Sequence, residues 1–151
     1  MKYLLLILTL FIFISCSKSN PIPQDSSIKS YRIDDSYLKR LDFKGQELIS
    51  IFQNNTFYYV RKDGKAIQTL TYENKADPFS DGLARTKVNG KIGFFNTNLD
   101  IILKPIYDFA FPFYKGKAEI CTGCKEKNIG KHSMLEGGKW QKIDRSGLVI
   151  E

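Results

Sequence analysis

The chain has 151 residues, 42% of them hydrophobic, with a formal net charge of +7. This length suits one domain rather than two, and the excess of Lys and Arg favours contact with anionic surfaces. Because the chain contains a single histidine, a Ser-His-Asp or Cys-His catalytic site would have to use that residue.

The first fifteen residues have the composition of a signal peptide. Met1 and Lys2 precede an apolar run, YLLLILTLFIFI, over residues 3–14. A helix needs about 20 apolar residues to span a bilayer, and a run this short is typical of a signal-peptide core. A buried core helix would need a polar face, which the run lacks. We therefore predict a signal peptide over residues 1–15.

The signal peptide is followed by a motif centred on Cys16. Residues 14–16, Ile-Ser-Cys, resemble the lipobox of bacterial lipoproteins, although Phe13 stands where that pattern prefers Leu. The resemblance implies that Cys16 carries several acyl chains and becomes the N-terminus after cleavage. Each buried methylene contributes about 0.8 kcal/mol, so several chains hold a protein firmly on a membrane. Secretion without lipid and an uncleaved anchor are the alternatives.

Residues 16–30 are predicted to form the lipidated cysteine and a flexible tether. The segment SKSNPIPQDSSIKS is rich in Ser, contains two prolines and has almost no apolar side chain to contribute to a core. The anchor predicts a position in the bacterial cell envelope, outside the cytoplasm, and the lack of an acidic run directly after Cys16 favours the periplasmic side. Without Lys2, the mature chain has 22 basic and 16 acidic residues, a net charge of +6.

The remaining body, residues 31–151, reads as short strands joined by tight turns. Asn89-Gly90 lies between two short strand-like runs and is the strongest hairpin signal, because both residues tolerate positive φ. Asp63-Gly64 predicts a similar turn upstream, and RSG at residues 145–147 predicts a longer one. Apart from one helical turn near residues 36–41, no sustained helical stripe occurs. We predict an all-β domain of small antiparallel hairpins.

One short pattern occurs more than once along this body. FSDGLA at residues 79–84 aligns with FYKGKA at an offset of 34 residues, and NGKI at residues 89–92 aligns with GGKW at an offset of 48. A fainter copy lies 35 residues upstream. Such periods indicate repeated supersecondary units that bury a shared core. The predicted units are about residues 45–78, 79–112 and 113–151.

Residues 79–113, FSDGLARTKVNGKIGFFNTNLDIILKPIYDFAFPF, resemble the WG-repeat family of bacterial proteins. Its units read approximately Phe-x-x-Gly-Leu-Ala, then Gly-Lys-Trp-Gly, then Pro-x-Tyr-Asp. Ile92-Gly93 lacks the Trp of the naming dipeptide, and Trp140-Gln141 lacks its Gly. The resemblance covers residues 72–150 in two copies, with a fainter one before them. It implies β-hairpin repeats in the cell envelope and no established enzymatic activity.

The last unit carries an insertion, CTGCKEKNIGKHSMLEGGKW, which contains two cysteines and the only histidine. Three interpretations stay open. A disulfide would join Cys121 and Cys124 in an oxidising compartment. Zinc would bind Cys121, Cys124 and His132, with Glu126 or Glu136 as the fourth ligand. A thiol exchanger would use the same pair, its thiolate favoured by nearby lysines. The disulfide is the preferred interpretation, and His132 is expected in an exposed loop.

The sequence favours binding over catalysis. No glycine-rich phosphate loop occurs, and adjacent carboxylates such as Asp34-Asp35 point to opposite faces of a strand. We expect no enzyme activity and no cofactor besides the zinc of the alternative above. The expected protein is a membrane-anchored envelope lipoprotein that binds or scaffolds an envelope protein or an anionic polymer, but no nucleic acid. The alternative function is metal binding or thiol redox chemistry at Cys121, Cys124 and His132.

Overall fold

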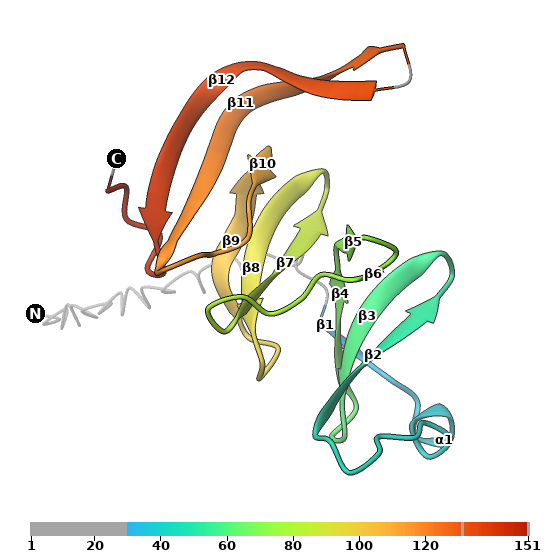
Figure 1. Cartoon of the computed structure of the whole chain (residues 1–151). Helices are drawn as coiled ribbons and strands as arrows, with labels where there is room; N and C mark the ends of the chain where they lie inside the picture. The colour runs from blue at the N-terminus through green and yellow to red at the C-terminus, as the bar shows by residue number, and fades with distance from the viewer. Residues whose placement is uncertain (1–29, 131, 151) are drawn as a thin grey trace, which may run out of the picture.

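The computed structural model describes residues 30–130 and 132–150, so the predicted signal peptide and almost all of the tether lie outside the described residues. The described residues form antiparallel sheets in an elongated stack (Figure 1). The elements in chain order are β1 Ser30–Arg32, α1 Asp35–Leu38, β2 Leu48–Gln53, β3 Thr56–Arg61, β4 Lys65–Thr69, β5 Thr71–Tyr72, β6 Lys75–Ala76, β7 Leu83–Val88, β8 Lys91–Asn96, β9 Ile101–Tyr107, β10 Phe109–Ala110, β11 Lys117–Ile129 and β12 His132–Asp144. The prediction of an all-β fold of antiparallel hairpins is confirmed.

Three hairpins with the same register form the framework of the stack. β2 pairs with β3, β7 with β8, and the first part of β11 with the last part of β12. The outermost pairs of the three hairpins are Leu48 with Arg61, Leu83 with Asn96, and Lys117 with Asp144. The offsets of 34, 35 and 48 residues therefore connect residues that occupy the same place in their hairpins. We call these hairpins and their following strands the first, second and third units.

A third strand follows the hairpin in the first and second units, whereas the described residues of the third unit keep only one bridge in its place. β4 pairs with β3, β9 pairs with β8, and a single bridge represents this pairing in the third unit. Asn96 and Asp144 occupy the same place before this strand, and each accepts hydrogen bonds through Oδ1 from the backbone N–H groups two and four residues further on. The second and third units thus share their turn chemistry as well as their register.

The short turns form where the sequence predicted them. Asn89-Gly90 joins β7 to β8 with φ values of 49° and 80°, and Asp63-Gly64 joins β3 to β4. The predicted helical turn is α1, where the Asp34 carboxylate accepts from the N–H of Ser36 at 2.9 Å. In residues 30–130 and 132–150, no helix is long and apolar enough to cross a membrane.

Two hydrophobic cores lie between successive units. A lone hairpin has no second layer against which to bury its apolar face, so each core needs two units. The core between the first and second units is made by Leu48, Tyr59, Ile67, Phe79, Ala84, Phe95, Leu99 and Ile101. The core between the second and third units is made by Leu83, Ile92, Phe94, Leu103, Tyr107, Ala110, Phe113, Ala118, Ile120 and Ile143.

A buried ion pair links strands β3, β7 and β10. Asp77, in the segment before β7, accepts from the backbone N–H of Arg85 at 2.8 Å and from its Nε at 3.1 Å. Both residues are buried. Arg85 Nη1 donates to the carbonyl of Ala110 at 2.9 Å, and the Tyr59 hydroxyl donates to the carbonyl of Asp77 at 2.9 Å. The polar groups of these four residues therefore satisfy one another, as burial requires.

Gly93, the glycine of the family dipeptide, is required by the close approach of β9. A Cβ atom at this position would lie 2.6 Å from the carbonyl oxygen of Leu103 and 2.7 Å from the nitrogen of Pro105. These contacts are to backbone atoms, which cannot move aside as a side chain can. Only glycine therefore lets the second unit close in this way.

Candidate functional site

The inserted segment of the third unit continues the hairpin, so the backbone of His132, which was expected in an exposed loop, belongs to a strand. β11 and β12 each have thirteen residues, and His132 begins β12 with its backbone paired to Ile129. Strand pairing satisfies the backbone polar groups that a loop of this length would leave to water. The ribbon curves away from the stack and over β10 and the β7–β8 hairpin (Figure 1). We call residues 123–138 the arm.

The arm bends at one interruption in its ladder. Thr122 pairs with Lys139 and Cys124 pairs with Gly137, but no pair joins Gly123 to Gly138 between them. Gly123, Gly137 and Gly138 have φ values of 78°, 71° and 73°, in the left-handed region where glycine has no steric cost. Three glycines thus allow the ribbon to turn sharply where it leaves the core.

A disulfide between Cys121 and Cys124 spans this interruption. Cys121 is fully buried and Cys124 nearly so. Gly138 lies directly against the bond, because a Cβ atom there would be 2.6 Å from Cys121 Sγ and 2.7 Å from Cys124 Sγ. The disulfide therefore fits against the opposite strand only because that strand has glycine at this point.

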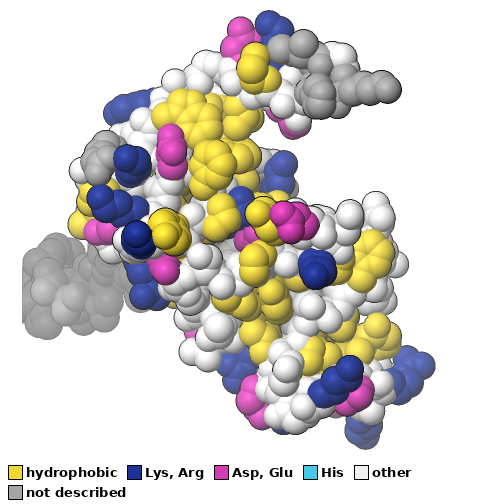
Figure 2. Space-filling view, in the orientation of Figure 1, with side chains coloured by type: hydrophobic (Ala, Val, Ile, Leu, Met, Phe, Trp, Pro, Cys, Tyr) yellow, Lys and Arg dark blue, Asp and Glu magenta, His cyan; other side chains and the backbone are white. Residues whose placement is uncertain are grey.

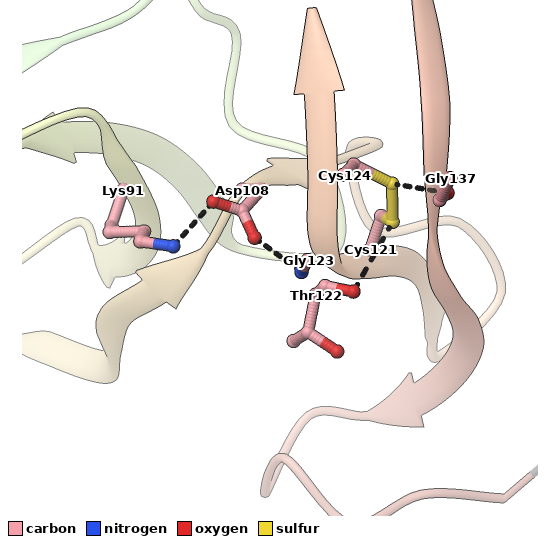
Figure 3. The surroundings of a disulfide bond; sticks show 7 residues. All are labelled: Lys91, Asp108, Cys121, Thr122, Gly123, Cys124 and Gly137. Atoms are coloured by element: carbon pink, nitrogen blue, oxygen red, sulfur yellow. Dashed lines mark hydrogen bonds and ion pairs between the residues drawn. A yellow bond between two sulfur atoms is a disulfide. The ribbon is translucent and has the colours of Figure 1, made fainter.

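Asp108 supports the same bend from the second unit (Figure 3). One carboxylate oxygen pairs with Lys91 Nζ, and the other accepts from the N–H of Gly123. The N–H of Asp108 donates to the carbonyl of Cys121 at 2.9 Å. The hydrogen bond from Lys91 holds the pKa of Asp108 below its usual value. An ionised Asp108 therefore fixes Gly123 between the core and the arm.

A hollow of about 1000 Å³ lies below the arm, with hydrophobic side chains gathered along it (Figure 2). We call it the arm hollow. Phe109 packs on Phe111 and on Trp140, with ring centroids 5.0 and 5.9 Å apart. The residues that line the hollow are Leu70, Thr71, Tyr72, Arg85, Lys87, Gly90, Ile92, Asp108, Phe109, Phe111, Pro112, Cys124, Glu126, Ser133, Met134, Leu135 and Trp140.

Some charged groups of the arm hollow already have partners within the protein, and others do not. Arg85 is held by Asp77 and the Ala110 carbonyl, and Asp108 is held by Lys91 and Gly123. Lys87 and Glu126 are exposed, and neither forms an ion pair with another described residue. Among the described residues that line the hollow, the charges without an ion-pair partner are thus one cation, Lys87, and one anion, Glu126.

The residues singled out from the sequence are only partly brought together. Cys121 and Cys124 are joined, whereas the backbone of His132 lies five residues beyond Cys124 along the ladder, and its side chain lies outside the described residues. Glu136 pairs with Lys127 at 3.0 Å. Among the residues that the structure describes, no group of three or more His, Cys, Asp or Glu could hold a metal ion. Cys16 also lies outside the described residues.

The aromatic members of the hollow were not predicted as site residues. Phe109 and Phe111 alternate with Ala110 along the chain, and Trp140 lies thirty residues further on, so only strand pairing brings them together. The sequence feature that could have indicated them is the large number of aromatic residues on both sides of the insertion, more than a buried core requires. The pairing register of β10, β11 and β12, rather than the composition of the sequence, places these rings on one surface.

Comparison with known proteins bears on the family alone. The sequence model of the "WG containing repeat" matches residues 70–91 and 92–123. Searches of curated proteins and of solved structures found no match. The matched segments include Gly93, which the close approach of β9 requires, and Asp108, which holds the base of the arm. The chain therefore contains WG repeats, matched at residues 70–91 and 92–123.

Proposed function

We propose that the protein is a lipid-anchored, non-enzymatic component of the cell envelope, and that the arm hollow binds an extended segment of another envelope protein. The observation that carries the binding proposal is the group of partly exposed aromatic rings in the hollow. Tyr72, Phe111 and Trp140 are 45%, 47% and 40% exposed. Exposed apolar surface of this kind marks interaction sites, and buried aromatic rings supply much of the energy in such contacts.

The charges of the hollow favour a polypeptide over an anionic polymer. Lys87 and Glu126 are of opposite sign, so a polyanion would gain one attraction and meet one repulsion. Aromatic-lined grooves bind extended peptides, because such segments present side chains to neighbouring pockets at little cost in entropy. The partner that fits is an extended segment with apolar side chains and little net charge.

The titratable groups of the hollow support binding rather than catalysis. A general acid or base works best with a pKa near the working pH, whereas Lys91 and Gly123 keep the pKa of Asp108 low. The sulfur atoms of Cys121 and Cys124 are joined in the disulfide, so neither offers a thiolate to a metal. These contacts favour binding over the alternative of metal or thiol chemistry.

Membrane anchoring is supported by the sequence of residues 1–16 and by the charge of the mature chain. The net charge of +6 adds attraction to anionic lipid headgroups near the anchor. The substitution Cys16→Ala should move the protein from the membrane fraction to the soluble fraction and abolish the incorporation of labelled palmitate. Membrane retention with unchanged labelling would contradict lipidation at Cys16.

The binding proposal is tested by photocrosslinking in intact cells. Benzoylphenylalanine replaces Phe111 in the hollow or, as a matched control, Phe52, which is 59% exposed on β2 and does not line the hollow. We expect adducts from position 111 but not from position 52, and mass spectrometry should map them to an extended apolar segment of an envelope protein. Equal yields at both positions, no adduct, or adducts only to glycans or lipids would contradict the proposal.

A further inference from the structure

We infer that the Cys121–Cys124 disulfide is a latch that fixes the angle of the arm, and that its reduction by a dithiol releases the arm. The bond spans the only interruption in the β11–β12 ladder among the described pairs. Gly123, Gly137 and Gly138 have positive φ, and the lack of a Cβ atom gives the backbone at these residues wide conformational freedom. A covalent bond across a flexible point restricts the directions that the outer ribbon can take.

Among the residues of the arm that the structure describes, few other contacts hold it in place. The core below it ends at Ile120 on β11 and at Ile143 on β12, and no described residue of the arm belongs to either core. The described side chains from Lys125 to Asn128 are exposed, as are Ser133 and Met134. The hydrogen bond from Gly123 to Asp108 fixes only the base. Regions with few buried contacts open locally at low cost in free energy.

The chemical step is a two-electron reduction. The dithiol gives up two electrons and two protons, its sulfur atoms join in a new disulfide, and Cys121 and Cys124 each become a thiol. The arm supplies Glu126, Met134 and Leu135 to the wall of the hollow. Release of the arm would therefore remove part of the binding surface. This consequence rests on the proposed function, whereas release of the arm does not.

Hydrogen exchange measured by mass spectrometry tests the latch without any ligand. The full chain carries Cys16→Ser, which removes the remaining thiol, and is compared in detergent before and after treatment with dithiothreitol. We expect amides of residues 124–137 to exchange about tenfold faster or more after reduction, while β7 and β8 keep their protection. Unchanged exchange in the arm, or equal acceleration in β7 and β8, would overturn the inference.

A second variant distinguishes the effect of losing the disulfide from any other effect of dithiothreitol. With Cys121→Ser and Cys124→Ser together, the arm should exchange at the reduced rate whether or not dithiothreitol is present. An arm that still responds to the reagent in this variant would show that the latch is not the cause. Crosslinking from position 111 distinguishes failure of the binding proposal from failure of the latch. If adducts are absent in both redox states while the exchange difference persists, the binding proposal fails and the latch stands.

Discussion

The second and third units build the same hairpin on the core and differ at its tip. Six residue pairs of β7 and β8 have counterparts in the base of β11 and β12. The second unit then closes with Asn89-Gly90, whereas the third inserts the sixteen residues of the arm, residues 123–138, in that place. The tip of a hairpin lies outside the core, so it can lengthen without changing the register below it.

The outward faces of the two units differ as well. Leu83 and Phe94 are buried in the core that the second unit shares with the third. Their counterparts in the third unit are Lys117 and Lys142, which are exposed. A polar outer face is typical of units that are not covered by another unit. The faces toward the preceding unit correspond instead, with Ala84 and Ala118 both buried, so the two units share this face and differ on the other.

The largest expected effect concerns the ion pair that ties the units together. Asp77→Ala leaves Arg85 buried without its partner, which should lower the free energy of unfolding by about 3–5 kcal/mol. Glu47→Ala is the matched control, because Glu47 forms an exposed pair with Lys62 and should cost less than about 1 kcal/mol. Urea denaturation measures both. Equal, small losses would show that the stack does not depend on the buried pair.

A smaller loss of stability is expected from substitutions at Gly137 and Gly138, two of the three glycines at the base of the arm. Gly137 and Gly138 both have positive φ, but only Gly138 has atoms of the disulfide in the space of a Cβ, whereas Gly137 faces open space. Gly137→Ala should cost about 1 kcal/mol for the backbone alone, and Gly138→Ala about 2–4 kcal/mol because the clash is added. Thermal or urea unfolding compares the two variants. Similar losses would mean that the disulfide does not pack against Gly138.

The smallest effect concerns Lys91 and Asp108. Because the folded pKa of Asp108 is lowered, the pair stabilises the protein above the unfolded value near 3.8, and this contribution is lost as the pH falls through the lower folded pKa. Lys91→Met should cost about 0.5–1 kcal/mol at pH 7, since Lys91 is partly screened by solvent. The cost should shrink below about pH 4. A cost that does not change with pH would contradict the ion pair.

Local turn chemistry allowed much of the fold to be predicted from the sequence. Asn89-Gly90 and Asp63-Gly64 specify their turns through adjacent residues, and the offsets followed from the repeated patterns FSDGLA/FYKGKA and NGKI/GGKW. The arm was not predictable in this way. Its segment lacks a clear alternation of apolar residues, and it forms strands because two segments of equal length pair across a turn. The partnership of Asp77 with Arg85 likewise depends on tertiary contacts.

Replacement of the arm by the turn of the second unit is the most direct test that the second and third units are equivalent. In this variant residues 123–138 are replaced by Asn-Gly, and backbone NMR shifts and urea unfolding are measured on the full chain. If the third unit is a second-unit hairpin with an added arm, the variant should unfold cooperatively and keep the shifts of β2, β3, β7 and β8. Collapse of those shifts, or loss of cooperative unfolding, would show that the arm belongs to the core and that the units are not equivalent.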